Sequence, residues 1–219
     1  QAFESALNMT TLPQPETGKT PRRTLILGSS SAYRRALLER LGIPFRIVSP
    51  DIDESPLAGE HPAATARRLA REKAKAVADQ LSADQRDTLI IGSDQVAVMG
   101  DRVFGKPGNH DKAVAQLQSL SGNIVVFETA LCLYDALNGQ AHEELVSTEV
   151  EFRTLTLEEI EAYLKREPAY DCAGSAKSEA LGIALLDRLS GDDPTALVGL
   201  PLIALCRLLR HAGLNPLLA

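Results

Sequence analysis

The hydrophobic residues of this chain follow two different periods from residue 24 onward. Short apolar runs predict buried strands at 24–28, 45–48, 88–91 and 183–189, and longer runs predict strands at 123–134 and 143–152. The chain stays extended over 96–99, and 100–101 is typical of a hairpin tip. Amphipathic spacing predicts helices at 33–41, 62–80, 111–120, 156–165 and 201–211. Because strands alternate with helices while the two long runs meet at an Asn-Gly turn, we expect an α/β fold with a mixed, twisted sheet flanked by helices.

Residues 1–23 lack this periodicity. They contain three prolines and several threonines, and they do not resemble a secretory leader. We therefore predict a flexible extension over 1–23 and a single catalytic domain over 24–219, with two lobes around a cleft. No apolar run approaches the roughly 20 residues that span a bilayer, so no membrane association is expected.

The composition narrows the functional classes. The chain has 219 residues, of which 44% are hydrophobic and 24% charged, and its net charge is −6. A chain with this acidic net charge lacks the basic surface that a general nucleic-acid binder needs. Three cysteines without a Cys-x-x-Cys motif predict reduced thiols and a cytoplasmic protein. The four histidines are scattered, which argues against a histidine zinc site.

The first candidate for chemistry is a serine-rich turn between a strand and a helix. Ser29 belongs to this turn, and Arg34 and Arg35 follow in the first helical turn. Free backbone N–H groups and the positive end of the helix dipole suit a phosphate there. Two arginines oppose that dipole, so they indicate a bound anion. A serine-capped surface helix with solvated arginines is the alternative.

Acidic residues supply the second group of candidates. Asp94 follows a buried strand and precedes Gln95, a position where a carboxylate serves as a general base or metal ligand. Asp53 and Glu54 offer further oxygen ligands for a divalent metal. An ordinary turn at Asp94 and a solvated acidic loop at 53–54 are the alternatives.

Two lysines stand at unusual places. Lys73 falls on the apolar stripe of the predicted helix 62–80, and Lys106 lies in a Gly-Lys-Pro turn. Residues 100–107 nearly match a P-loop, but Pro107 replaces the required hydroxyl and the segment is extended, so we reject that motif. Cys172 begins a run of small and polar residues suited to a binding-site wall, without a histidine partner for a cysteine nucleophile. An acidic chain that gathers cations in this way is suited to a polyphosphate with a divalent metal.

These motifs, in this order, resemble the Maf family of nucleotide pyrophosphatases. The resemblance covers about residues 24–217. It is carried by Leu-Gly-Ser-Ser-Ser-Ala-Tyr-Arg-Arg at 27–35, Asp-Glu at 53–54, Leu-Ala-x-x-Lys-Ala at 69–74, Ile-Gly-Ser-Asp-Gln at 91–95, Gly-Lys-Pro at 105–107, Leu-Ser-Gly at 120–122 and Val-Gly-Leu-Pro at 198–201. It implies a Maf/ITPase-like fold and hydrolysis of a nucleoside triphosphate to the monophosphate and diphosphate, with Mg²⁺ or Mn²⁺. A homodimer is an expectation of the resemblance alone.

Within the family, Gly-Ser-Asp-Gln at 92–95 and Cys-Ala-Gly-Ser-x-Lys-Ser-Glu at 172–179 resemble the branch that acts on 7-methyl-GTP. The resemblance implies that Asp94 is the catalytic base and that Tyr33, Gln95 and Glu179 determine specificity. The phosphate-binding residues are then Ser29, Arg34, Lys73 and Lys106, with Asp53 and Glu54 as metal ligands.

Several positions depart from the family pattern. Gly28 and Ala32 stand where alanine and proline are usual, Tyr33 where this branch often has tryptophan, and Ala180 where glycine is usual. The alternatives are a dTTP/UTP or other modified-nucleotide pyrophosphatase, and a non-catalytic nucleotide-binding regulator of cell division. A phosphotransferase is disfavoured because the P-loop fails.

Overall fold

A seven-stranded sheet in the order β2-β1-β3-β5-β6-β7, with β4 paired to β3, runs through the computed structural model, which describes residues 23–219. The strands are β1 (Thr24–Leu27), β2 (Arg46–Ile47), β3 (Thr88–Met99), β4 (Arg102–Phe104), β5 (Ile124–Asp135), β6 (Gln140–Phe152) and β7 (Leu186–Gly191). The helices are α1 (Ala32–Glu39), α2 (Pro62–Ala78), α3 (His110–Leu120), α4 (Leu157–Arg166) and α5 (Leu202–His211). Short 3-10 turns are η1 (Ala83–Gln85), η2 (Ala173–Ser175), η3 (Leu181–Leu185) and η4 (Ala196–Val198).

The sheet is mixed, as predicted. β1 pairs in parallel with β2 and β3, and the other pairs are antiparallel. β1 ends at Leu27, opposite Ile91, while β3 continues for eight more residues, to Met99. The carboxyl end of β1 therefore opens beside the middle of β3. A ligand site is expected at such an edge, because the chain leaves the sheet there and turns into the start of a helix.

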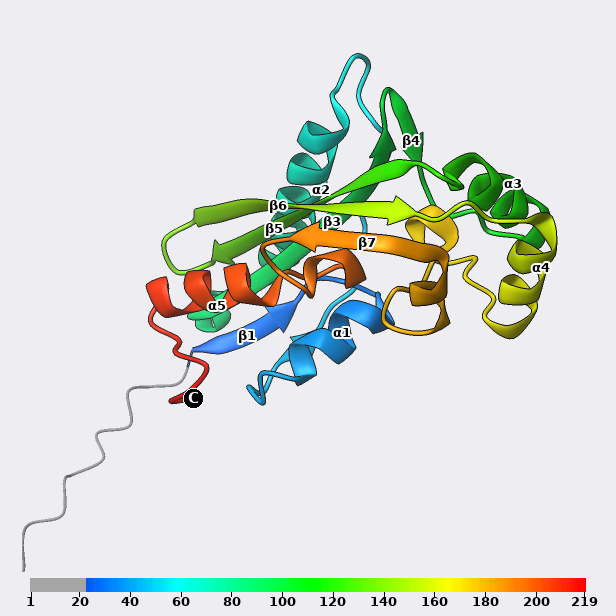
Figure 1. Cartoon of the computed structure of the whole chain (residues 1–219). Helices are drawn as coiled ribbons and strands as arrows, with labels where there is room; N and C mark the ends of the chain where they lie inside the picture. Colours follow the sequence, from blue (N-terminus) through cyan, green and yellow to red (C-terminus); the bar gives the residue numbers. More distant parts are fainter. Residues whose placement is uncertain (1–22) are drawn as a thin grey trace, which may run out of the picture.

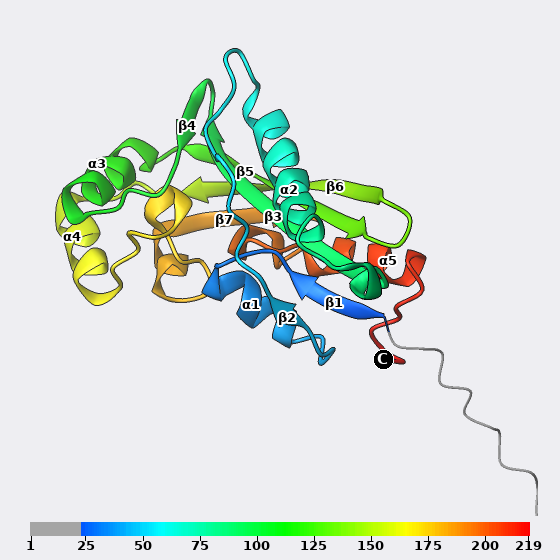
Figure 2. The same ribbon diagram turned by 180° about the vertical axis from the view of Figure 1, so that it is seen from behind.

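Helices cover the sheet on both faces and at one end (Figures 1 and 2). The helix α2 packs on one face through a cluster that includes Ala70, Ala74 and Ile90. The other face is covered by α1 and α5, with Leu37 and Leu205 in the core between them. The helices α3 and α4 lie together at the far end of the sheet and enclose a separate cluster of buried residues. The long strands thus join two packed halves, which agrees with two lobes.

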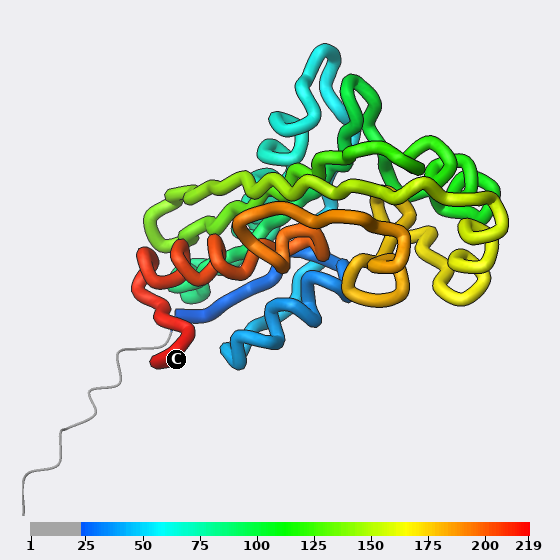
Figure 3. The backbone as a smooth tube through the Cα atoms, in the orientation of Figure 1, coloured from blue at the N-terminus to red at the C-terminus, as the bar shows by residue number. Residues whose placement is uncertain are grey.

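The predicted elements are confirmed, except near residues 91 and 183. The strand predicted at 88–91 does not end before Asp94 but continues through it to Met99 as β3, paired with β5 along this length. The apolar run at 183–189 does not form one strand, because η3 occupies Leu181–Leu185 before β7 begins at Leu186. Tertiary contacts impose this turn, since a Cβ at Gly182 would lie 2.5 Å from the Lys177 backbone nitrogen. The tube in Figure 3 shows this segment folding back before β7.

The start of the described chain is anchored to the sheet. Arg23 forms ion pairs with Asp87 and Asp135, so it does not belong to the flexible extension predicted over 1–23. The rest of that prediction lies outside the described residues. Among residues 23–219, no helix has both the length and the hydropathy needed to cross a bilayer.

Candidate active site

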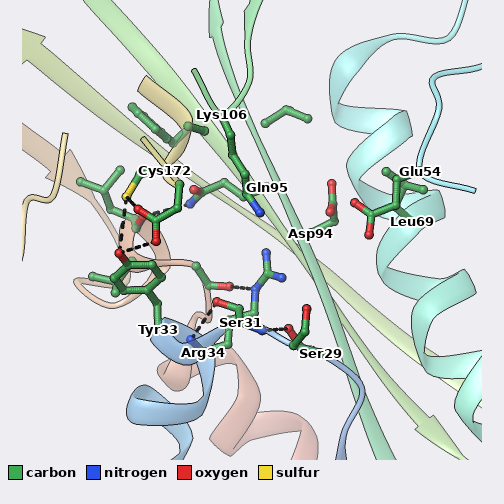
Figure 4. A pocket seen from close by; sticks show the side chains of 18 of the residues that line it. Ser29, Ser31, Tyr33, Arg34, Glu54, Leu69, Asp94, Gln95, Lys106 and Cys172 are labelled. Atoms are coloured by element: carbon green, nitrogen blue, oxygen red, sulfur yellow. Dashed lines mark hydrogen bonds between the residues drawn. The ribbon is translucent and has the colours of Figure 1, made fainter. Parts of the chain in front are cut away.

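A cleft of about 640 Å³ opens beside the carboxyl end of β1. Its walls come from the start of α1, from α2 and β3, from the loop after β4, from the segment 171–179 and from η4. The residues predicted from the sequence line it, with two exceptions, Arg35 and Asp53. Arg35 is exposed and pairs with Glu39 one helical turn further along α1, at 2.8 Å. Figure 4 places Tyr33 and Cys172 on one side, Asp94 and Glu54 on the other, and Arg34 between them.

Asp94 is held in the cleft wall by a buried lysine. The Lys73 Nζ atom lies 2.7 Å from Asp94 Oδ1 and 3.1 Å from Glu54 Oε1. The side chains of Lys73 and Asp94 are 6% and 11% exposed, whereas that of Glu54 is 60% exposed. A buried ammonium needs such partners, because unpaired burial of its charge is costly. This contact uses only Oδ1 of Asp94, so Oδ2 points to no hydrogen-bond donor among residues 23–219.

A glycine in β3 brings that lysine within reach. A Cβ on Gly92 would lie 2.0 Å from the carbonyl oxygen of Ala70, which no real contact allows. Because Gly92 has no side chain, α2 packs directly on the strand. This close approach positions Lys73, which follows Ala70 by about one helical turn, against Asp94.

The start of α1 forms the floor of the cleft. Ser31 caps the helix, its Oγ accepting from the Arg34 backbone N–H at 3.3 Å, while Ser29 Oγ accepts from the Ser31 N–H at 3.1 Å. The Arg34 side chain donates from Nε to the Gly199 carbonyl at 2.8 Å. Burial lowers the pKa of Arg34, although the charges of Asp94 and Glu54 oppose this effect. A guanidinium stays charged despite such a shift, so a fixed cation faces the cleft.

The residues on either side of Asp94 point to the opposite face of β3. Ser93 Oγ donates to the carbonyl of Gly199 at 3.0 Å. The Gln95 amide nitrogen donates to Thr129 Oγ1 at 2.9 Å and to two carbonyls of η4 at 3.0 Å. Gln95 lines the cleft, but these bonds occupy its amide N–H groups. The resemblance implies a specificity role for Gln95, and in the structure its amide nitrogen is bonded to the η4 loop.

The lysine of the Gly-Lys-Pro turn also reaches the cleft. Lys106 is exposed and follows β4. Its loop is fixed from two sides, because Gln116 Nε2 donates to the Gly105 carbonyl at 3.1 Å and the Gly108 N–H donates to the Tyr170 carbonyl at 2.9 Å. The second bond joins this loop to the segment that carries Cys172.

Tyr33 links α1 to the far wall of the cleft. Its hydroxyl donates to Asp171 Oδ2 at 2.9 Å, and the Lys177 ammonium lies 5.5 Å from the centre of its ring and 3.5 Å from Asp171 Oδ1. Burial, together with the bond to Asp171, raises the pKa of Tyr33 to about 12, so the phenol stays protonated. Glu179 lies exposed in the same wall.

The structure does not bring Asp53 into the cleft, which corrects the prediction that Asp53 and Glu54 act together. The Asp53 carboxylate instead accepts from the Ser55 backbone N–H at 2.9 Å in an Asx turn. Hydrogen bonding from the Ser55 side chain, and then from its backbone N–H, lowers the pKa of Asp53. Glu54 faces Lys73 and Asp94. Among the described residues, no three His, Cys, Asp or Glu side chains gather as a complete metal site.

Sequence reasoning missed two contributors to the cleft. Asp171 lies just before the predicted run of small and polar residues, and the Gly199 carbonyl belongs to the Val-Gly-Leu-Pro motif, for which the sequence predicts no contact. Both act on residues more than a hundred positions away. The only local sign was that Asp171 directly precedes the small-residue run at 172–176.

Comparison with known proteins agrees with this architecture. A family model described as Maf-like protein matches residues 24–212. The chain belongs to the Maf family. The resemblance inferred from the ordered motifs is thereby confirmed, and the Maf match begins at the first residue of β1 and ends just after α5.

Curated Maf relatives align along nearly their whole length. A protein of Burkholderia orbicola (strain AU 1054), named 7-methyl-GTP pyrophosphatase, is 61% identical over 198 residues, which cover 90% of this chain and 93% of the relative. Proteins of the same name from Burkholderia thailandensis and Cupriavidus metallidurans are each 58% identical. Their alignments cover 91% and 88% of this chain, and 92% and 94% of the relatives.

Proposed function

We propose that this Maf protein hydrolyses 7-methyl-GTP to 7-methyl-GMP and diphosphate. The observation that carries the proposal is the buried Lys73–Asp94 pair, which presents a carboxylate oxygen to a cleft large enough for a nucleotide. Relatives named for this activity match the chain at about 60% identity over most of its length.

The phosphates bind on the α1, α2 and β4 side of the cleft. This phosphate half comprises Ser29, Arg34, Lys73, Lys106, Asp94 and Glu54. Arg34 and Lys106 neutralise the triphosphate, and the free N–H groups at the start of α1 donate to phosphate oxygens. Positioned cations and N–H donors also stabilise the charge that develops during phosphoryl transfer, usually the main catalytic contribution.

Asp94 acts as the general base. A water held at Asp94 Oδ2 gives its proton to the carboxylate and attacks the α-phosphorus. The new P–O bond forms while the bond from the α-phosphorus to the bridging oxygen breaks, and diphosphate leaves with the bond electrons. Lys73 holds Asp94 at a fixed position through Oδ1, so Oδ2 remains directed at the water.

A divalent cation fits the same side of the cleft. Asp94 and Glu54 converge on one ammonium, and Mg²⁺ is commonly held by one or two carboxylates together with substrate phosphates. Glu54 would hold Mg²⁺ or Mn²⁺ beside the substrate phosphates, because the two oxygens of Asp94 are assigned to Lys73 and to the attacking water. When bound, the cation would neutralise phosphate charge.

The base binds near Tyr33. This base half comprises Tyr33, Asp171, Lys177 and Glu179. The aromatic ring offers a stacking surface for a cationic methylated base. Glu179 accepts hydrogen bonds from the N1–H and amino group of guanine, a pattern that pyrimidines lack.

The test is incubation of the purified protein with Mg²⁺ or Mn²⁺ and a panel of 7-methyl-GTP, GTP, dTTP, UTP and CTP, with diphosphate and orthophosphate both measured. The expected result is diphosphate released chiefly from 7-methyl-GTP. Release chiefly from dTTP or UTP would overturn the base preference and keep the reaction. Orthophosphate alone, or no turnover, would overturn the reaction itself.

A further inference from the structure

Asp171 joins two parts of the chain that meet at the base half. It lies between α4 and η2, lines the cleft, and accepts the Tyr33 hydroxyl bond through Oδ2 at 2.9 Å. Its other oxygen lies 3.5 Å from the Lys177 ammonium. Burial opposes the charge of Asp171, but the bonds from Tyr33 and the charge of Lys177 hold the pKa of this carboxyl below its usual range. The base half therefore carries an ionised carboxylate next to the aromatic ring.

The two halves of the cleft differ in the sign of their charge. In the base half, the carboxylates of Asp171 and Glu179 both line the cleft, and the one ammonium, that of Lys177, lies 3.5 Å from Asp171 Oδ1. The phosphate half has the opposite excess, with three cationic side chains and two carboxylates. A matching ligand has a positive ring at one end and negative phosphates at the other. The 7-methylguanine ring carries a positive charge, whereas the guanine ring of GTP is neutral.

We propose that Asp171 is a specificity-determining residue that favours a cationic 7-methylated ring over neutral guanine. This inference rests on the proposed function and extends it to a residue that the ordered motifs do not include. Asp171 acts in two ways: its charge attracts the ring cation, and its hydrogen bond fixes the orientation of Tyr33.

Lys177 provides the test that separates charge from structure. Its ammonium lies beside Asp171 and over the Tyr33 ring, so it opposes a ring cation. If charge determines selectivity, removing the carboxylate and removing the ammonium should shift the preference for 7-methyl-GTP over GTP in opposite directions. If the cluster only holds the loop in place, both changes disturb the same wall and should shift that preference in the same direction.

The experiment measures kcat/KM for diphosphate release from 7-methyl-GTP and from GTP. Asp171→Asn keeps an oxygen that can accept the Tyr33 bond and removes the charge, so the 7-methyl-GTP/GTP ratio should fall about fivefold, the size expected for an exposed charge contact. Lys177→Met should raise the ratio. Both effects should shrink at high salt, because salt screens exposed charges. Asp187→Asn, at an exposed position in β7 outside the cleft, is the matched control.

The outcomes distinguish the two proposals. A wild-type enzyme that does not hydrolyse 7-methyl-GTP overturns the proposed function and this inference with it. A wild type that hydrolyses it, with an unchanged ratio in Asp171→Asn, overturns the role of Asp171 alone. A ratio lowered by both variants and insensitive to salt also overturns it, in favour of a structural role. Thermal unfolding of each variant confirms that the fold is retained.

Discussion

Three residues of the phosphate half, Arg34, Lys73 and Asp94, belong to helices or to β3, whereas the base half has only Tyr33 in a helix and draws its other residues from the irregular segment between α4 and β7. Asp94 and Lys73 belong to β3 and α2, are almost fully buried, and are locked by a direct ion pair. Asp171 and Glu179 lie in a loop and are exposed. Under the proposed function, the reaction depends on groups whose positions the core determines, and the choice of base depends on groups in an exposed loop. The two properties should therefore respond differently to substitution.

The largest expected effect is the loss of turnover in Asp94→Asn. An amide cannot accept the proton of the attacking water, so kcat should fall roughly 10²-fold or more. Initial rates of diphosphate release measure the effect, and circular dichroism checks the fold. Asp101→Asn, at the exposed turn between β3 and β4, should retain full activity. If the Asp94→Asn enzyme were active, Asp94 would not be the general base, and the contrast drawn between the two halves of the cleft would fail.

Gly92→Ala tests whether the core sets the geometry of the phosphate half. The new methyl group would overlap the Ala70 carbonyl, so α2 must shift and Lys73 with it. We expect a loss of about 1–3 kcal/mol in the free energy of unfolding, as for other overpacked sites, together with reduced kcat. Gly105→Ala is the stability control, because its Cβ would meet no atom within 4 Å. Equal unfolding free energies for the two variants would contradict the close packing of α2.

Glu179→Gln should change the choice of substrate and leave the reaction intact. Loss of a charged hydrogen-bond acceptor should lower the preference for 7-methyl-GTP over dTTP by about tenfold or more. The ratio of kcat/KM values measures it, and the free energy of unfolding should stay near the wild-type value because Glu179 is exposed. An unchanged preference would remove Glu179 from base recognition.

The smallest effect concerns Cys172, whose thiol reports the local charge of the base half. Burial, together with the charge of Asp171, raises the pKa of Cys172 to about 12. A raised thiol pKa keeps the protonated form, so alkylation by iodoacetamide should be slow near neutral pH and accelerate about tenfold per pH unit through about pH 9. Asp171→Asn should lower this pKa and speed the reaction.

Cys172→Ser supplies the background rate from the other two cysteines. A rate in the wild type that levels off before about pH 9 would mean an ordinary thiol pKa, and hence a weaker local field than the structure indicates. If Asp171→Asn were alkylated at the wild-type rate, the Asp171 carboxylate would not raise the pKa of the Cys172 thiol.

The same contrast explains what the sequence could predict. The helix α4 follows from its capping box, in which Thr156 and Glu159 bond each other's backbone N–H groups. Periodicity predicts the place of Lys73, because a lysine on an apolar helix stripe is a local pattern. The prediction that Asp94 follows the end of a strand is wrong, since Asp94 lies within β3. These residues lie in regular elements, where spacing alone specifies the direction of a side chain.

The base half was harder to predict because its contacts are not local. The bond between Tyr33 and Asp171 spans 138 positions. The apolar run at 183–189 favoured a strand by residue type, but a bond from the Gly182 N–H to Glu167 and close packing on Lys177 impose a turn. Asp53 and Glu54 are neighbours of the same chemistry, and only the fold shows which of them faces Lys73.

The alternation of side chains along β3 has a consequence for how such an enzyme can diversify. Asp94 faces α2, while Ser93 and Gln95 on either side hold the η4 loop on the opposite face. Inserting or deleting one residue in this strand would exchange the two faces and separate the Asp94 carboxylate from Lys73. Length changes are therefore barred from β3, whereas the segment 169–179 can vary in sequence without disturbing that pairing. Related hydrolases could change the nucleotide that they accept through substitutions in segment 169–179. A library randomised over this segment would change substrate preference in the same way.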